Sequence, residues 1–215
     1  MDKIPAVITQ CSIDEFLERL ASADPTPGGG SAAAIMGAMG AALVSMVCNV
    51  SIGKKGCESA GEELRAVRAQ SETLRLRLAA MVAEDVAAFD ALMAAYKLPK
   101  ASDLDKARRA DAIQASLRSA TEVPLDCARA CTEVIKLARR AGEHGYRGVI
   151  SDAGVGVSAA YSAARSAALN VFINAPALKD RRFADQSTAE LEELLDFCAV
   201  ESEQVYRLVR GKLEG

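Results

Sequence analysis

Apolar residues recur along most of this chain at the spacing of helices. In segment 58–96, Leu, Val, Met and Phe return three and four residues apart, which is typical of one face of a long α-helix. The same spacing predicts helices over 12–23, 103–140 and 187–212. Nowhere do Val, Ile, Tyr and Phe alternate with polar residues over the length of a strand, so no strand is predicted.

Two further segments are apolar on nearly every side. The segment 31–53 has no charge before its end, and 151–174 has only Arg165 past its first turn. The uncharged stretch from residue 25 to 53 is long enough to span a bilayer. Ala, Gly and Ser dominate it, however, and Leu, Ile and Phe are few. We therefore predict two central helices buried on all sides by protein, and no membrane span.

These six segments predict an all-α protein, a bundle of five long helices plus a short N-terminal helix, in one domain over residues 1–215. Alanine, with 42 of the 215 residues, supports this fold because it favours helices and lets them approach closely. The stretches PTPGGGS (25–31) and AGEHGYRG (141–148) predict loops. Pro124 predicts a kink or a break inside the segment that starts at 103.

Charge and cysteine usage exclude several classes of protein. The net charge is −3 with both signs interspersed, which does not suit a nucleic-acid backbone. The six cysteines form no CxxC pair and His144 is the only histidine, so we expect no metal site and small, reduced, buried thiols. The first ten residues lack the basic-then-apolar layout of a signal peptide, which predicts a cytoplasmic protein.

Asp85 is the first candidate for chemistry. It falls on the apolar stripe of the 58–96 helix, whereas Glu84 and Asp90 fall off it. A carboxylate on a buried face loses hydration unless something compensates. Two interpretations stay open, a structural partner inside the bundle or a carboxylate that lines an internal cleft.

Other polar residues lie at apolar faces or helix ends. Asn170 and Asn174 share one face of a nearly apolar helix, where they make either structural hydrogen bonds or ligand contacts. The three glycines 28–30 precede Ser31 and either present N–H groups to a ligand or form a turn with Ser31 as the cap.

The remaining candidates sit where helices are expected to begin or end. The first interpretation of Ser151 and Asp152 is that they form the N-terminal cap of a helix. The pairs Lys54/Lys55 and Lys97/Lys100 complement helix dipoles whether or not they meet a ligand.

Three blocks of this sequence carry a resemblance. They are PTPGGGSAAAIMGAMGAALVSMVCNVSIGKK, EDVAAFDALMAAYKLPK and SDAGVGVSAAYSAARSAALNVFIN, in this order. Together they resemble the cyclodeaminase/cyclohydrolase family of folate enzymes over nearly the whole chain. The resemblance implies a helical homodimer without metal or redox cofactor.

The resemblance also implies roles for residues. The catalytic carboxylate of the D-x-x-A-F stretch is Asp85 here. The substrate-binding positions that the resemblance implies are Gly28, Gly29, Gly30, Ser31, Lys54, Ser151, Asp152, Asn170 and Asn174. Lys97, like Lys54, Lys55 or Lys100, is expected to hold the anionic glutamate tail of folate. Relatives often have Asn where this chain has Tyr146, which departs from the pattern.

The implied reaction is hydrolysis of 5,10-methenyltetrahydrofolate to 10-formyltetrahydrofolate. A carboxylate suits it, because it can stabilise the amidinium cation or take the proton of the attacking water. Two alternatives stay open: a formiminotetrahydrofolate cyclodeaminase, which releases ammonia, and a non-catalytic helical oligomer that binds folate or a protein partner.

Overall fold

The structure is a computed structural model of the chain and describes residues 11–215. These residues form helices and connecting turns, and no strand. The elements are α1 (Ile13–Leu20), α2 (Gly29–Ser51), η2 (Glu58–Ala60), α3 (Gly61–Tyr96), α4 (Asp103–His144), η3 (Arg147–Val149), α5 (Ile150–Asn174), η4 (Ala175–Ala177) and α6 (Arg181–Glu214). The predicted all-α bundle of five long helices and a short first helix is confirmed.

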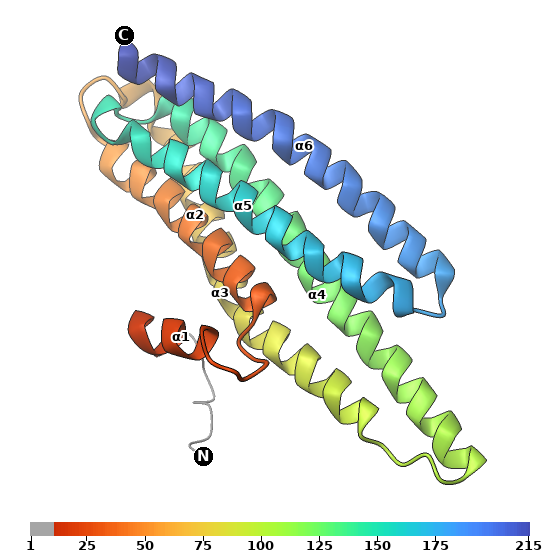
Figure 1. The fold of residues 1–215 in the computed structure, drawn as a ribbon. Coiled ribbons are helices and arrows are strands. Elements are labelled where there is room, and N and C mark those ends of the chain that lie inside the picture. The colour runs from red at the N-terminus through yellow and green to blue at the C-terminus, as the bar shows by residue number, and fades with distance from the viewer. Residues whose placement is uncertain (1–10) are drawn as a thin grey trace.

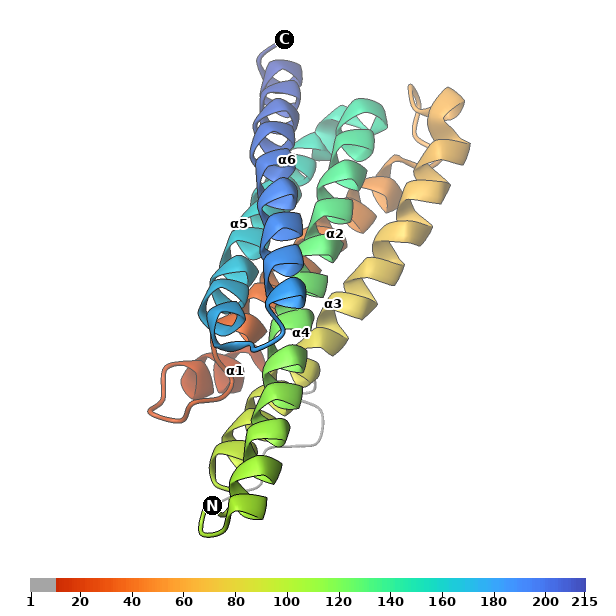
Figure 2. The ribbon, with the colours of Figure 1, turned by 90° about the vertical axis from the view of Figure 1, so that its right-hand side faces the viewer.

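The five long helices run side by side along one axis of the molecule (Figures 1 and 2). α5 packs against α2, α4 and α6, and α2 also packs against α3 and α4. The α3/α4 hairpin projects past the other helices at one end (Figure 1). Small residues let α2 and α5 meet closely, since a Cβ on Gly40 would stand 2.8 Å from the Gly156 carbonyl oxygen.

Several predicted boundaries are wrong. α2 begins at Gly29, so part of the expected glycine loop is helical, and α6 begins at Arg181, where the Asp180 side chain accepts from the Phe183 N–H as an N-cap. α4 passes through Pro124 without a break and ends at His144, which therefore closes a helix and does not lie in a loop. One proline removes only one backbone hydrogen bond of the helix. The packing of α4 against α3 and α5 keeps the helix continuous on either side of Pro124.

The predicted burial of α2 and α5 on all sides is also wrong. Met39 of α2 is 57% exposed, and on α5 Leu169 is 68% and Ile173 75% exposed. The other helices of one chain cover only the inner sides of α2 and α5. α2 is the one described helix long and apolar enough to span a membrane, yet 56% of its most apolar stretch is buried inside the bundle, as in the core helix of a bundle.

Candidate functional site

Asp85 lies where the start of α2 crosses the middle of α3. The Ser31 hydroxyl, fully buried in the first turn of α2, donates a 2.8 Å hydrogen bond to Asp85 Oδ2. The two residues are 54 positions apart in sequence, so helix packing alone brings them together. Ser31 is therefore not the N-cap of α2, as one interpretation had it; Gly28 is at that position, with no side-chain hydrogen bond.

Gly30 makes the close approach of the two helices possible. A Cβ at this position would stand 2.0 Å from Asp85 Oδ1 and 2.6 Å from its Cγ, whereas a Cβ on Gly29 would meet nothing within 4 Å. The carboxylate thus lies directly against the Cα of Gly30. The first turn of a helix carries free N–H groups and a positive dipole end, which favour an anion there. The anion beside this turn is the protein's own carboxylate.

Burial sets the protonation behaviour of Asp85. Loss of hydration raises the pKa of its carboxyl above the ordinary value, and hydrogen bonding to the Ser31 side chain and backbone opposes this rise. No positive side chain among residues 11–215 contributes to the pKa of Asp85. Its charge is therefore uncompensated by any cation of the described chain.

A cavity of about 390 Å³ opens beside Asp85, between α3, α4 and the end of α5. Asp85 is its only charged lining residue in the described part of the chain. The polar lining is completed by Asn170 and Asn174 of α5. The rest is apolar or aromatic and comprises Ala88, Phe89, Leu92, Met93, Tyr96, Leu117, Ala120, Val123, Pro124, Ile173 and Ala177. Such a cavity suits a flat, largely apolar ligand with a positive or hydrogen-bond-donating group.

The two asparagines are oriented by backbone carbonyls. Asn174 Nδ2 donates to the carbonyl oxygen of Ala120 on α4 at 2.8 Å, and Asn170 Nδ2 donates to that of Ser166 at 3.2 Å. Asn174 thus makes a structural hydrogen bond between helices, the bond of Asn170 stays within α5, and both residues also line the cavity.

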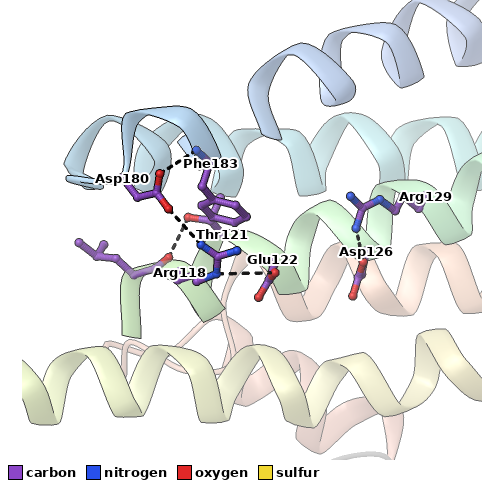
Figure 3. A network of polar contacts seen from close by, with 8 residues as sticks. Arg118, Thr121, Glu122, Asp126, Arg129, Asp180 and Phe183 are labelled. Atoms are coloured by element: carbon purple, nitrogen blue, oxygen red, sulfur yellow. Dashed lines mark hydrogen bonds and ion pairs between the residues drawn. The ribbon is translucent and has the colours of Figure 1, made fainter. Parts of the chain in front are cut away.

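The turn after Asn174 is tied firmly to α4. Arg118 of α4 pairs with Asp180 at 3.3 Å and lies over the Phe183 ring, 3.8 Å from its centroid (Figure 3). Gln114 of α4 donates to the Ala177 carbonyl and accepts from the Lys179 N–H. These contacts hold the end of α5 in place at the wall of the cavity.

Not all predicted site residues share this cavity. Lys54 follows the other end of α2, and Ser151 and Asp152 begin α5, which runs antiparallel to α2. At 1.5 Å per residue, each group lies about 30 Å along its helix from the end near Asp85. Lys54, Ser151 and Asp152 therefore do not line this cavity within a single chain. Ser151 is not an N-cap either, because α5 begins at Ile150 after Val149.

The lysines at helix ends have different surroundings. Lys54 Nζ lies over the Tyr146 ring, 5.7 Å from its centroid. Lys97 directly follows Tyr96 of the cavity wall and is exposed, about 18 Å along the axis of α3 from Asp85. Lys100 lies further along, in the exposed turn between α3 and α4. Lys97 and Lys100 are therefore placed at the same end of the molecule as the cavity.

The sequence alone did not reveal the aromatic and proline walls of the cavity. Phe89 and Tyr96 lie four and eleven positions after Asp85, which is the helical spacing of one face, so this signal was present. Pro124 was seen only as a helix breaker, and its place in the wall depends on how α4 meets α5. Within residues 11–215, no three His, Cys, Asp or Glu side chains are grouped so as to hold a metal ion.

Comparison with known proteins gives matches along nearly the whole chain. Residues 12–193 match the family described as formiminotransferase-cyclodeaminase. A methenyltetrahydrofolate cyclohydrolase of Methylorubrum extorquens is 54% identical over 202 residues, which cover 94% of this chain and 97% of that relative. A formimidoyltransferase-cyclodeaminase of Rattus norvegicus is 30% identical over 96% of this chain, which spans 38% of that longer relative.

A solved structure agrees with these matches. The crystal structure of a formiminotetrahydrofolate cyclodeaminase from Thermotoga maritima superposes with a TM-score of 0.82 at 30% identity, covering 97% of this chain and 98% of that one. Sequence and fold thus match over the same nearly full length. The chain belongs to the formiminotransferase-cyclodeaminase family.

Proposed function

We propose that this protein is a methenyltetrahydrofolate cyclohydrolase, which hydrolyses 5,10-methenyltetrahydrofolate to 10-formyltetrahydrofolate in the cytoplasm. The observation that carries the proposal is a half-buried carboxylate, Asp85, with no cationic partner in the described chain, at the wall of a largely apolar cavity. A ligand with a delocalised cation complements that charge. The 54% identical relative that bears this name supports the same substrate.

In this proposal, Asp85 is the general base. Water adds to the carbon that bridges N5 and N10 of the substrate, and Asp85 accepts the proton that the water loses. The C–N5 bond then breaks, and Asp85 returns the proton to N5. The hydroxyl group on the same carbon gives its proton to solvent as it becomes the formyl carbonyl, so that the formyl group stays on N10 and one proton is released for each cationic substrate. A pKa raised towards neutrality favours such two-way transfer, because the protonated and ionised forms are then closer in free energy.

Binding roles follow from the geometry. Asn170 and Asn174 contact the substrate in the cavity, while Gly30 and Ser31 act on it through Asp85. Lys97 and Lys100 hold the anionic glutamate tail beyond the Tyr96 wall, since a folate is long enough to extend from Asp85 towards the hairpin tip. Lys54, Ser151 and Asp152 lie too far away to join this site within one chain.

A formiminotetrahydrofolate cyclodeaminase is the second candidate, because relatives at about 30% identity and the superposed structure bear such names. Its substrate loses ammonia from the same carbon. The two activities are separated by offering each substrate to the purified protein in a buffer with a chelator, since we propose that neither metal nor cofactor is needed. We expect turnover of the methenyl substrate and no release of ammonia from the formimino substrate. Ammonia release alone would establish the second candidate, and indifference to both would indicate a non-catalytic oligomer.

We further propose a homodimer that covers the outer face of α2 and α5. Met39, Val155 and Leu169 are exposed on these two helices, and α2 itself carries no charge. Beside them, a hollow of about 500 Å³ between α5 and α6 has mostly apolar walls and Arg165 as its charged group. Light scattering at micromolar concentration is expected to give twice the 22.6 kDa chain mass. A monomer mass would contradict this proposal and leave the cavity at Asp85 unaffected.

A further inference from the structure

Pro124 stands in the middle of a buried helix and in the wall of the cavity. α4 is 42 residues long and continues on both sides of it. Proline has no backbone N–H, so the carbonyl four residues earlier, that of Ala120, receives no hydrogen bond from the helix ladder. An interior proline also destabilises a helix relative to alanine. Its presence in a core position therefore needs a physical reason.

The free carbonyl has a partner outside its own helix. Asn174 Nδ2, at the end of α5, donates to the Ala120 oxygen at 2.8 Å. A carbonyl oxygen only accepts hydrogen bonds, so the amino group of Asn174 must be the end of the amide that points to α4. The amide oxygen Oδ1 is then the end left for the cavity, which Asn174 lines.

We propose that Pro124 is a positioning residue: by leaving the Ala120 carbonyl free, it holds the Asn174 amide so that Oδ1 faces the cavity and accepts a hydrogen bond from the ligand. Asn170 has its Nδ2 engaged too, by the Ser166 carbonyl one turn earlier in α5. Together with the Asp85 carboxylate, the polar wall then presents acceptor oxygens from three side chains. Its ligand is a heterocycle with N–H donors or a positive charge, and its identification as methenyltetrahydrofolate rests on the proposed function.

Pro124→Ala tests this role because it restores the missing N–H. The new N–H donates to the Ala120 carbonyl within α4 and competes with the Asn174 amide for that oxygen, so the hydrogen bond that holds the amide weakens. We expect kcat/KM for methenyltetrahydrofolate to fall about 10-fold, the size of one lost positioning hydrogen bond. The melting temperature stays the same or rises, because alanine favours the helix. A merely structural proline would lower stability and activity together when replaced.

A double-mutant cycle shows whether Pro124 acts through Asn174. In an Asn174→Ala background, Pro124→Ala is expected to change kcat/KM less than twofold, since the group that it positions is gone. Asn174→Asp supplies a second variant that keeps the oxygens but has no N–H for the Ala120 carbonyl, and we expect it to lose as much activity as Asn174→Ala. If the losses of kcat/KM from Pro124→Ala and Asn174→Ala multiply in the double variant, the two residues act independently and the proposal is overturned. Native turnover of Asn174→Asp would overturn it as well.

A spectroscopic readout separates this proposal from the proposed function. In ¹⁵N-labelled protein without ligand, the side-chain NH₂ signals of Asn174 are identified by their loss in Asn174→Ala. They are expected to shift and to exchange faster with solvent in Pro124→Ala, while those of the distant Asn49 stay unchanged. If the wild type hydrolyses no methenyl substrate but the Asn174 signals respond, the proposed function fails and the positioning role stands. Unchanged Asn174 signals in Pro124→Ala would overturn the positioning role whatever the turnover.

Discussion

Replacing Asp85 by asparagine is expected to lower kcat for methenyltetrahydrofolate about 10²–10⁴-fold, the usual contribution of a general base. The two side chains have nearly the same shape, so the amide oxygen can still accept from the Ser31 hydroxyl. What disappears is the negative charge and the ability to take a proton. Steady-state turnover and melting temperature are to be measured on the same preparations.

The raised pKa of Asp85 predicts the direction in which Asp85→Asn changes the stability of the fold. Burial raises the pKa of Asp85, so the folded protein holds the proton more tightly than the unfolded chain does. Above the folded pKa the ionised carboxylate therefore destabilises the fold, and below the unfolded pKa the group is neutral in both states and has no effect. At neutral pH the asparagine variant should melt at the same temperature as the wild type, or higher. A lower melting temperature with near-native kcat would show that Asp85 is structural.

Glu84→Gln is the matched control. Glu84 is the neighbouring carboxylate on α3, but it is paired with Arg77 at the partly exposed side of the helix. Exposed pairs of this kind contribute little to stability, and Glu84 does not line the cavity. Turnover and melting temperature should both stay close to the wild-type values. A Glu84→Gln loss as large as that of Asp85→Asn would remove the reason to single out Asp85.

Gly30→Ala is expected to reduce kcat/KM by about 10² or more while most of the fold survives. The added Cβ would lie 2.0 Å from Asp85 Oδ1, so the carboxylate must rotate away from α2 and from the Ser31 hydroxyl. A displacement of about 1 Å at a reacting group can cost this much activity. The clash is with the end of a side chain and not with backbone, which is why the bundle can tolerate it.

Gly29→Ala provides the control one residue earlier in the same turn. A Cβ there meets nothing within 4 Å, and Gly29 is exposed. Because alanine favours helices over glycine, this variant should keep full activity and melt no lower than the wild type. Equal activity losses in the two variants would show that the glycines serve the flexibility of this turn, and not the close contact with Asp85.

The fold was largely predictable because its helices carry regular apolar spacing. The stripe on α3 passes through Leu64, Val67 and Leu78, which are fully buried, and it placed Asp85 on the inner face. The start of α6 was missed by six residues because Arg181 to Gln186 add little to its apolar stripe, and the cap at Asp180 was not recognised. Helix existence is a repeated signal, whereas each helix end depends on one or two local contacts.

The site was only partly predictable because its contacts join residues far apart in sequence. Spacing and resemblance singled out Asp85, Asn170 and Asn174, and the structure brings these three to one cavity. The hydrogen bond from Ser31 to Asp85 depends on how α2 crosses α3, which no local pattern encodes. The same holds for the Ala120 carbonyl and its Asn174 partner.

The outer faces of α2 and α5 show a further limit of pattern analysis. Their scarcity of charge predicts burial on all sides, whereas the structure leaves part of both helices exposed in a single chain. Within one chain, Met39 and Leu169 have no cover. A helix with few charges therefore predicts burial without telling whether the burying surface belongs to the same chain or to a second one.

The central claim is that the cavity at Asp85 hydrolyses methenyltetrahydrofolate, and the near-ultraviolet absorbance of the methenyl group tests it most directly. Equal concentrations of the wild type, Asp85→Asn and a protein-free control are followed in chelator-containing buffer at neutral pH. We predict that the band decays rapidly with the wild type and that the product is 10-formyltetrahydrofolate. With Asp85→Asn, the band is expected to decay at a rate close to that of the control. A wild-type decay no faster than the control, or equal decay with both proteins, would contradict the claim.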